Sequence, residues 1–423
     1  MPIGASCRTG APRGTDTPIR RGGMAGAILL GLLTLAGCTA APVQAPKSPP
    51  TAQSLDDAVD GLTVALFAHA QRDPADAAAP RVLVIDPLID RGTGNQAVVT
   101  RAMEQRMVAR VRQSVPNVEP RPFTAETLDG RPLLLTGSIT AVAGPGAVPP
   151  KVDGEPTVYR IWASISDLRT GKVISKEMAW VRADQVDMTP TPFFRDSPTW
   201  AADRSMTAYL KTCSSNPGEP IDPAYLNGVK AAVATAAGIE AYENGRPLEA
   251  LVSLTEAQNL PGGDQVRVHN GLYLANVALG RRAAAEQEFG RMVDAGLSQG
   301  KLAVKFVFRP ASTQFWPDRA ISGPYPMWLR EIALHTAERG SCMRLVGHTS
   351  PTGNPELNDL LSERRARFVR ANLVQRQRVL ASRTEAIGRG SREPIVGTAR
   401  DDASDVLDRR VELVPFGCVA VGS

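Results

Sequence analysis

Ser350, Asn358 and Arg365 are three polar residues near the C-terminus whose spacing would let one local unit bring them together. A guanidinium group can hold a carboxylate through two parallel hydrogen bonds, and it keeps its charge at physiological pH. Arg365 is therefore the candidate for binding an acidic group of a ligand. The chemistry expected here is non-covalent recognition of a carboxylate.

The surrounding sequence indicates the elements that position this cluster. Residues 343–346 form an apolar strand, residues 347–353 form a Gly/Pro-rich turn, and an amphipathic helix follows. The apolar residues expected along one side of that helix are Leu357, Leu361, Phe368 and Leu373. The strand, turn and helix would place the three polar side chains around the connection between the strand and the helix.

Catalysis and metal binding have little support in the sequence. Ser350 and His348 stand only two residues apart on a strand end, and the nucleophile motif GxSxG is absent. The histidines lie far apart without cysteine or acidic residues at metal-binding spacing; they are His69, His269, His335 and His348. We therefore expect no enzyme activity, no metal and no cofactor.

Residues 301–421 carry motifs that resemble those of the OmpA-like domain. The family pattern is GHTDxxG, then Asn, LSxxRA and a late NRRV. It corresponds here to Gly347-His348-Thr349-Ser350-Pro351-Thr352-Gly353, Asn358, Leu361-Ser362 with Arg365-Ala366, and Asp408-Arg409-Arg410-Val411. The resemblance implies a βαβαββ domain whose remaining elements are a first strand at 302–308, a helix at 327–338, a third strand near 386–395 and a closing strand at 409–414.

The OmpA-like resemblance also implies a ligand. In that family the Asp of GHTD and the Arg of LSxxRA hold the diaminopimelate of a peptidoglycan stem peptide without a covalent bond. Here Arg365 matches, Ser350 replaces the aspartate and Asp408 replaces the asparagine of NRRV. Glu356 or Asp359 would then have to meet the ligand's ammonium group. The implied peptidoglycan site consists of Thr349, Ser350, Asn358, Arg365 and Arg409.

The helix after the turn is unusually basic. Its arginines are Arg364, Arg365, Arg367, Arg370, Arg376 and Arg378. A run of like charges most often forms a solvated helix face. We expect this of all of them except Arg365, whose place in the motif directs it toward the turn.

Residues 1–37 have the features of a bacterial lipoprotein signal peptide. Four arginines precede an apolar run at 25–36 that is too short to cross a bilayer as a helix. The run ends in Leu35-Ala36-Gly37-Cys38, which resembles a lipobox and implies that Cys38 is lipidated and becomes the mature N-terminus. By the sorting rule of enteric lipoproteins, which depends on whether aspartate follows the lipidated cysteine, Thr39 indicates the outer membrane, facing the periplasm. An uncleaved anchor is the alternative.

Residues 38–53 are rich in Pro, Ala and Ser and are expected to be a disordered tether.

The overall charge argues against binding to nucleic acid. The net charge of +5 falls to +2 once the four arginines and one aspartate of the leader are removed. A nucleic-acid partner is therefore not expected.

Cys213, Cys342 and Cys418 remain after the leader and the lipid site. A periplasmic location permits disulfides. We favour a pair between Cys342 and Cys418, because the first opens the strand before the turn and the second closes the last strand of the same domain. Two buried free thiols are the alternative, and Cys213 is left without a partner.

Residues 54–213 are expected to form an α/β domain. The predicted elements are a helix at 54–71, a strand at 81–86, a Gly-rich turn at 91–95, a helix at 97–112, and strands at 133–139, 158–167 and 173–181. The Gly-rich turn lacks both phosphate-binding patterns, GxGxxG and GxxxxGK[ST], so an ordinary turn is expected. The order resembles the periplasmic domains of the envelope lipoproteins CsgG and LpoB, which implies partner binding or assembly.

Residues 222–298 contain an imperfect helical repeat that resembles tetratricopeptide units. Gly245 and Gly280 are 35 residues apart, as are Ala250 and Ala285. Two such units cannot cover both of their open faces, since arrays need about three. The segment is therefore expected to dock on a neighbouring domain or a partner. A peptide-binding groove is the alternative to plain packing.

The sequence thus predicts an α+β multidomain protein with two candidate functions. The first is a tether that joins the outer membrane to peptidoglycan. The second is a scaffold subunit of an envelope assembly or secretion complex whose OmpA-like domain has lost that ligand. In either case, envelope proteins are expected to bind the N-terminal domain and the helical segment.

Overall fold

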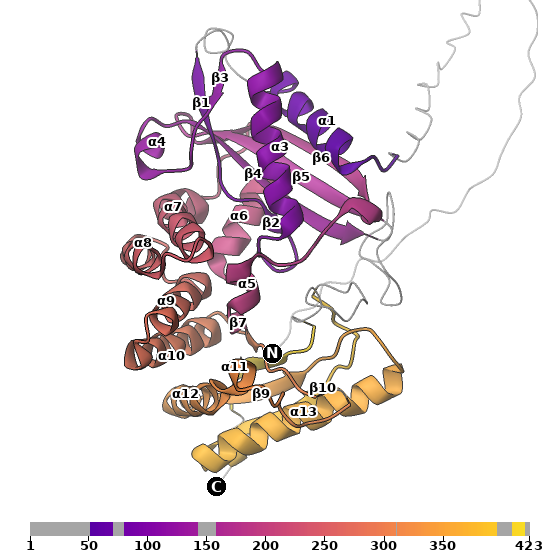
Figure 1. The fold of residues 1–423 in the computed structure, drawn as a ribbon, viewed down its shortest axis with the longest axis vertical. Helices are drawn as coiled ribbons and strands as arrows, with labels where there is room; N and C mark the ends of the chain where they lie inside the picture. Colours follow the sequence, from indigo (N-terminus) through magenta and orange to yellow (C-terminus); the bar gives the residue numbers. More distant parts are fainter. Residues whose placement is uncertain (1–50, 71–79, 143–157, 310, 396–407, 419–423) are drawn as a thin grey trace, which may run out of the picture. The chain divides into compact units, whose positions relative to one another are not determined.

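The computed structural model describes residues 51–70, 80–142, 158–309, 311–395 and 408–418 (Figure 1). The expected signal peptide, Cys38 and nearly all of the tether lie outside these residues, so the structure says nothing about them.

The N-terminal part is built on a mixed sheet with strand order β3-β1-β4-β5-β6, and β2 pairs with β4. Its strands are β1 (Arg81–Ile85), β2 (Ile89–Asp90), β3 (Val118–Pro120), β4 (Leu133–Val142), β5 (Val158–Asp167) and β6 (Lys172–Arg182). β1 is parallel to β3 and β4, whereas β4, β5 and β6 are antiparallel. Gly171 makes the turn between β5 and β6 with a φ of 68°, a conformation that glycine adopts without strain.

Helices cover this sheet on both faces. α1 (Leu55–Ala68) and α3 (Val98–Ser114) share one apolar core with the sheet, where Leu66, Met103 and Met107 are fully buried. The other face is covered by α4 (Ala125–Asp129), α6 (Arg204–Ser214) and the first helix of the next segment. A short 3₁₀ helix, Ala183–Gln185, follows β6.

The helical segment consists of α7 (Pro223–Glu243), α8 (Pro247–Asn259), α9 (Val266–Ala278) and α10 (Arg282–Ser298), each in contact with the next. Glycines let these helices approach closely: a Cβ at Gly238 would lie 2.5 Å from Cγ of Leu254. The segment docks on a neighbour, because α10 packs against α12 of the C-terminal part. Phe289 of α10 stacks on Trp328 of α12 with ring centroids 5.4 Å apart.

The C-terminal part has a second sheet with strand order β10-β9-β11-β8-β7. Its elements are β8 (Leu302–Val304), α11 (Arg319–Ser322), α12 (Tyr325–Glu338), β9 (Cys342–Gly347), α13 (Pro355–Arg376), α14 (Leu380–Arg383), β10 (Thr384–Gly388) and β11 (Val411–Phe416). β9 and β10 are parallel, and β11 runs antiparallel to both β9 and β8. This is the expected strand and helix order.

The fifth strand of this sheet comes from another part of the chain. β7 (Thr199–Trp200), which follows α5 (Pro192–Asp196), pairs antiparallel with β8. The sequence did not predict this strand. One apolar core therefore runs from Phe193 of α5 through the helical segment to Leu345 of β9.

Two local expectations were wrong. The strand expected at 302–308 ends at Val304, after which Phe306 and Phe308 turn into the core. Leu357 is 65% exposed because it lies outside the buried face of α13, which consists of Asn358, Ser362, Arg365, Ala366, Val369 and Leu373. Residues 213–222, between the expected α/β domain and the helical segment, are tied to β6, since Val173 donates its backbone N–H to the carbonyl oxygen of Glu219.

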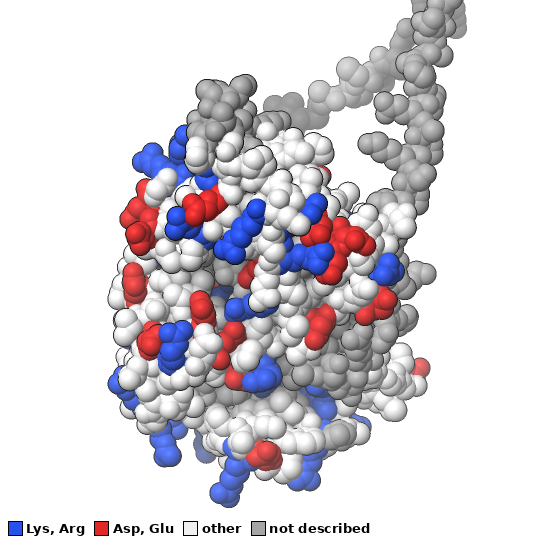
Figure 2. All heavy atoms as spheres, turned by 45° about the horizontal axis from the view of Figure 1, so that its top comes forward, with Lys and Arg blue, Asp and Glu red and all other residues white. Residues whose placement is uncertain are grey.

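Two absences hold for the part of the chain that the structure describes. It contains no helix long and apolar enough to cross a membrane, and no group of three or more His, Cys, Asp or Glu side chains that could hold a metal ion. On the face drawn in Figure 2, basic and acidic side chains are interspersed, with neither sign forming a continuous field.

Candidate ligand-binding loop

The loop that follows β9 is held against the start of α13 by glycines. A Cβ at Gly347 would lie 2.0 Å from the carbonyl oxygen of Ser362, and one at Gly388 would lie 2.5 Å from the Ser362 hydroxyl. The ends of the parallel strands β9 and β10 therefore touch the helix backbone directly. The Ser362 hydroxyl also accepts a hydrogen bond of 2.9 Å from the backbone N–H of Gly390.

Asn354 and Asn358 fix the path of the loop. Asn354 is the N-cap of α13, and its side-chain oxygen accepts hydrogen bonds from the backbone N–H groups of Glu356 and Leu357. One turn later, Nδ2 of the buried Asn358 donates to the carbonyl oxygens of Thr352 at 2.9 Å and of Ser350 at 3.5 Å. The structure therefore brings Asn358 together with the turn that contains Ser350.

Ser350 and Thr349 are both nearly buried, at 5% and 4% exposure. The hydroxyl groups of Ser350 and Thr352 lie 3.2 Å apart. Thr349 donates its backbone N–H to Gly390, whereas its side-chain hydroxyl has no partner among the described residues. The loop thus presents hydroxyl groups, and no carboxylate, at the position where the family pattern has aspartate.

Arg365 lies on the same side of α13 as Asn358, two turns further on, and is buried. Its Nε donates to the carbonyl oxygen of Ser312 at 3.1 Å, and its Nη2 donates to that of Arg309 at 3.3 Å. The guanidinium carbon lies 4.9 Å from the ring centroid of Phe308. The segment after β8 therefore holds the guanidinium in place, which the sequence did not indicate.

The remaining expected residues occupy the start of β11 and of α13. Arg409 is half-buried just before β11, and the buried Asp408 accepts a hydrogen bond of 2.6 Å from the backbone N–H of Ile395. Asp359 pairs with Arg392 at 2.5 Å, whereas Glu356 is exposed at the helix start. Arg364, Arg367 and Arg378 are exposed, as expected for a solvated face. Arg370 is an exception, because it is half-buried and donates to the carbonyl oxygens of Thr384 at 2.8 Å and Ala381 at 2.7 Å.

A group of charges around the buried Glu412, behind the loop, was missed by the sequence reasoning. Arg410 Nη2 lies 2.7 Å from Glu412 Oε1, Lys301 Nζ lies 3.0 Å from the same oxygen, and His348 Nε2 lies 3.5 Å from Oε2. The available signal was the alternation in β11, because Arg410 and Glu412 are two residues apart and so face the same side of the strand.

These neighbouring groups and the burial of the site shift the pKa values of Glu412 and His348. Burial alone would raise the pKa of Glu412, but His348, Arg410 and Lys301 together hold it well below its usual range. Burial lowers the pKa of His348, and Arg410 acts in the same direction against the attraction of Glu412. His348 is therefore a neutral partner of a permanently charged carboxylate, which makes it part of the support of the loop.

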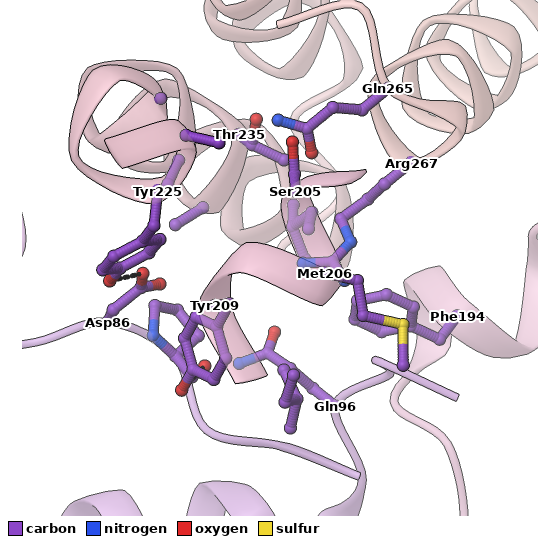
Figure 3. A pocket seen from close by; sticks show the side chains of 17 residues that line it. Asp86, Gln96, Phe194, Ser205, Met206, Tyr209, Tyr225, Thr235, Gln265 and Arg267 are labelled. Carbon is purple, nitrogen blue, oxygen red and sulfur yellow. Dashed lines mark hydrogen bonds between the residues drawn. The ribbon is translucent and has the colours of Figure 1, made fainter. Parts of the chain in front are cut away.

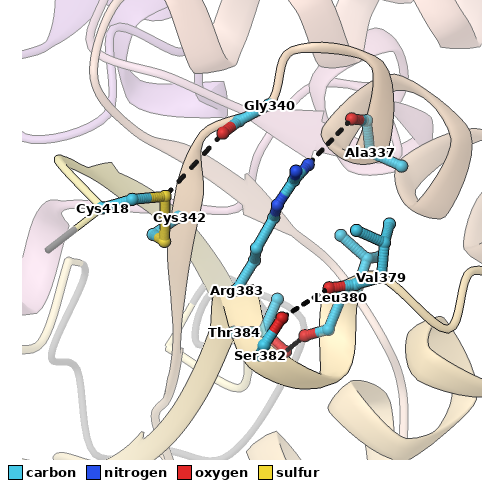
Figure 4. The surroundings of a disulfide bond; sticks show 9 residues. All are labelled: Ala337, Gly340, Cys342, Val379, Leu380, Ser382, Arg383, Thr384 and Cys418. Atoms are coloured by element: carbon cyan, nitrogen blue, oxygen red, sulfur yellow. Dashed lines mark hydrogen bonds between the residues drawn. A yellow bond between two sulfur atoms is a disulfide. The ribbon is translucent and has the colours of Figure 1, made fainter. Parts of the chain in front are cut away.

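A disulfide joins Cys342 to Cys418, with the two Cα atoms 5.1 Å apart (Figure 4). The pairing follows from the sheet register, in which Cys342 at the start of β9 lies opposite Phe416 at the end of β11. Cys213 is a buried free thiol. The favoured pairing from the sequence is the one present in the structure.

Residues 328–406 match the OmpA family. The peptidoglycan-associated lipoprotein of Pseudomonas aeruginosa is 33% identical over 137 residues, which is 32% of this chain and 80% of that protein. The chain belongs to the OmpA family through its C-terminal part. A second relative of this OmpA-family chain, the peptidoglycan-associated lipoprotein of Pseudomonas putida, is 32% identical over 137 residues and is covered to 81%.

A solved structure is also similar to part of this OmpA-family chain. It is the peptidoglycan-associated lipoprotein from Burkholderia pseudomallei, which is 23% identical, with 29% of this chain and 93% of that chain covered and a TM-score of 0.23.

Proposed function

We propose that this chain is an envelope lipoprotein whose C-terminal domain binds peptidoglycan non-covalently at the loop after β9. The observation that carries the proposal is the 33% identity to a peptidoglycan-associated lipoprotein, four-fifths of which is covered. The OmpA-family match at residues 328–406 includes both the loop and α13.

The proposed site consists of Thr349, Ser350, Asn358, Arg365 and Arg409. Arg365 supplies the charged donor for a stem-peptide carboxylate, and the loop carbonyls held by Asn358 offer acceptors. Ser350 brings a neutral hydroxyl where the family pattern has a carboxylate. The attraction for a ligand ammonium group is therefore weaker here, and we expect a lower affinity than a site with both charges would give.

Retention of the protein on purified sacculi tests this proposal. The full chain is the appropriate sample, because a fragment starting at residue 301 would lose β7, which pairs with β8. We expect the wild-type chain to be retained, Arg365→Lys to be retained at least tenfold less, and Ser350→Asp to be retained more strongly. Arg367→Lys, an exposed neighbour on the same helix, is the matched control and should behave as wild type.

The outcome that overturns peptidoglycan binding is equal and low retention of the wild type, Ser350→Asp and Arg365→Lys. Circular dichroism of each variant at the assay temperature separates a lost contact from lost folding.

A second candidate function is a scaffold subunit of an envelope assembly or secretion complex. Three observations favour it: Ser350 and Asp408 depart from the family pattern, β7 is inserted into the sheet, and one core joins this domain to the helical segment. Under this proposal Ser350→Asp gains retention that the wild type lacks. Crosslinking and purification from membranes would then have to yield a defined partner complex.

We also propose that the chain is anchored in the outer membrane through lipid on Cys38 and faces the periplasm. The lipobox and the names of its relatives support this placement. Mass spectrometry of the mature N-terminal peptide tests it. A Cys38→Ala variant should lose the acyl mass and move from the membrane to the soluble fraction.

The N-terminal domain, proposed to be CsgG/LpoB-like, and the helical segment, proposed to be tetratricopeptide-like, would bind other envelope proteins. The strand, helix and hairpin order of the first, and the successive packing of α7 to α10, support these assignments. Charged substitutions at exposed apolar residues, Met178→Glu in the first segment and Val252→Glu in the second, should weaken a crosslinked partner band that survives Arg365→Lys.

A further inference from the structure

A pocket remote from the loop lies where the N-terminal sheet meets α7 and α9 (Figure 3). Its free volume is about 60 Å³, counted as space for the centres of water-sized atoms, which is room for a few waters or a small ligand. One side is formed by the chain just beyond the carboxyl end of β1, which is where ligands commonly bind to sheets with parallel strands. Its position is typical of a ligand-binding site.

The side of α7 that faces the pocket is made of small residues. Ala224, Gly228, Ala232 and Ala236 recur at four-residue spacing and therefore lie along one helix face. The neighbouring face packs into the core with the larger Val229 and Val233. The small residues leave the space open, although they do not by themselves define a ligand.

One end of the pocket offers a buried carboxylate. Asp86 is 6% exposed and comes directly after β1. Its Oδ2 accepts a hydrogen bond of 2.5 Å from the hydroxyl of Tyr225, whereas its Oδ1 accepts none from the described residues. Burial raises the pKa of Asp86 to about 6, so the carboxylate is charged at neutral pH. It is a partner for a cationic or N–H donor group.

The other end offers a guanidinium. Arg267 donates from Nη2 to the carbonyl oxygen of Gly94 at 2.7 Å and lies 5.6 Å from the ring centroid of Phe194. Its remaining N–H groups make no hydrogen bond with residues in the described ranges. Gln265 beside it uses Nε2 on the carbonyl oxygen of Gly262, so only its Oε1, an acceptor, faces a ligand. The guanidinium of Arg267 is therefore the group at this end that suits a carboxylate.

Figure 3 shows the two ends on opposite sides of the pocket, with Asp86 and Tyr225 at one and Arg267 and Gln265 at the other. Met206 lies on the Arg267 side, beside Phe194, and apolar residues such as Ile239 complete the lining. A ligand that fits has a positive group that reaches one end and a negative group that reaches the other.

We propose that this pocket binds a zwitterion of the amino-acid or short-peptide class, with its ammonium group at Asp86 and its carboxylate at Arg267. The Asp86 end supplies Oδ1 and the oxygen of Tyr225 as acceptors. The Arg267 end supplies parallel N–H donors that match a carboxylate. This site shares no residue with the loop after β9, so it goes beyond peptidoglycan binding.

Isothermal titration calorimetry of the full chain at pH 7.5 tests the proposal. The probes are L-leucine, L-alanyl-L-alanine and tri-L-alanine, each also in N-acetylated and C-amidated form. We expect at least one unblocked probe to bind and each block to weaken its binding tenfold or more. The length of the best probe distinguishes a free amino acid from a peptide.

Two substitutions assign the ends of the ligand. In Asp86→Asn the unblocked probe should bind at least tenfold more weakly, and N-acetylation should make no further difference. In Arg267→Gln the same should hold for C-amidation. Arg246→Gln, an exposed arginine at the start of α8, is the control and should leave binding unchanged.

A substitution that fills the pocket tests binding without changing Asp86 or Arg267. Ala232→Phe would place a ring in the free space, so it should abolish probe binding while the protein remains folded by circular dichroism. The proposal is overturned if none of the unblocked probes binds, or if blocking either end leaves the affinity unchanged.

Discussion

The amine Nζ of Lys305 lies 2.9 Å from the carbonyl oxygen of Phe194, so an ionisable side chain just beyond β8 is buried against the last turn of α5. The same amine donates to the carbonyl oxygen of Arg195 at 3.2 Å. This contact and β7 connect the OmpA-family domain to the rest of the chain. Burial lowers the pKa of Lys305 from its usual 10.5 to about 7, against the attraction of Asp196.

The first prediction concerns the pH dependence of stability that Lys305 causes. Between pH 7 and 10.5 the unfolded lysine binds a proton that the folded one lacks, so the free energy of unfolding rises with pH in this window, by at most about 1.4 kcal/mol per unit. Urea unfolding at pH 7 to 10 measures it. In Lys305→Met this increment should disappear, and an unchanged slope would contradict the burial of a neutral amine.

The second prediction concerns the close contact of Gly347 with α13. In Gly347→Ala the new Cβ would meet the carbonyl oxygen of Ser362 at 2.0 Å, and neither backbone can yield without moving the loop. We expect a loss of roughly 3 kcal/mol or more in the free energy of unfolding. Gly61→Ala, in α1 with open space around it, is the control and should stabilise by roughly 0.5–1 kcal/mol.

The sequence predicted the elements that have a local pattern. The strand, turn and helix around Ser350 follow from apolar periodicity and Gly/Pro signals, and the pairing of Asn358 with that turn follows from the motif. The partner of Cys342 could be predicted because antiparallel neighbours bring a strand start beside a strand end.

Contacts between distant segments could not be predicted in the same way. β7 is only two residues long, so it has no alternation to detect, and its partner β8 is more than one hundred residues away, with Thr199 opposite Val304. The carbonyl groups of Arg309 and Ser312 that hold Arg365 belong to a loop whose path is set by Phe306 and Phe308 in the core. The exposure of Leu357 could not be predicted from apolar spacing, because the buried face of α13 includes the polar residues Asn358, Ser362 and Arg365.

The third prediction concerns the disulfide between Cys342 and Cys418, which are 76 residues apart. In the chain-entropy model, closing so long a loop contributes about 4 kcal/mol. Dithiothreitol should therefore lower the free energy of unfolding by about that amount, measured in urea. The double variant Cys342→Ala with Cys418→Ala should be insensitive to dithiothreitol. Equal sensitivity of both proteins would show that the effect has another source.

The same disulfide predicts a pattern of thiol labelling. Burial raises the pKa of the Cys213 thiol to about 11 and keeps it from solvent. The folded, oxidised mature protein should therefore take up no iodoacetamide on Cys213, Cys342 or Cys418. In urea it should take up one equivalent, at Cys213 by mass spectrometry. Labelling of Cys342 without a reductant would contradict the pairing.

The fourth prediction concerns the structural role of Arg365. Arg365→Met keeps an apolar stem near Phe308 but leaves the carbonyl oxygens of Arg309 and Ser312 without this donor. We expect a loss of roughly 2–3 kcal/mol in the free energy of unfolding. Arg367→Met removes only an exposed ion pair with Glu363 and should stay within about 0.5 kcal/mol. Similar costs for the two variants would contradict the buried contacts.

The last prediction follows from the buried carboxyl group of Asp86, whose pKa burial raises from 3.8 to about 6. Between these values the folded protein keeps a proton that the unfolded chain has lost, so stability falls as pH rises from about 4 to 6 and stays lower above that. Asp86→Asn can still accept the hydrogen bond from Tyr225 but cannot ionise, so its stability relative to wild type should increase across this window.

Urea unfolding of both proteins at pH 4, 5, 6 and 7.5 measures this difference, and the comparison cancels the titration of most other groups. The charged or titratable groups that interact with Asp86 are Arg267, Tyr209, Tyr225 and Glu104. A zwitterion bound at Asp86 needs a charged carboxylate. Probe affinity for the wild type should therefore rise with pH, although its stability falls, and the affinity should weaken below pH 6. A relative stability of Asp86→Asn that does not change with pH would show that Asp86 titrates normally and that the pocket does not bury its charge.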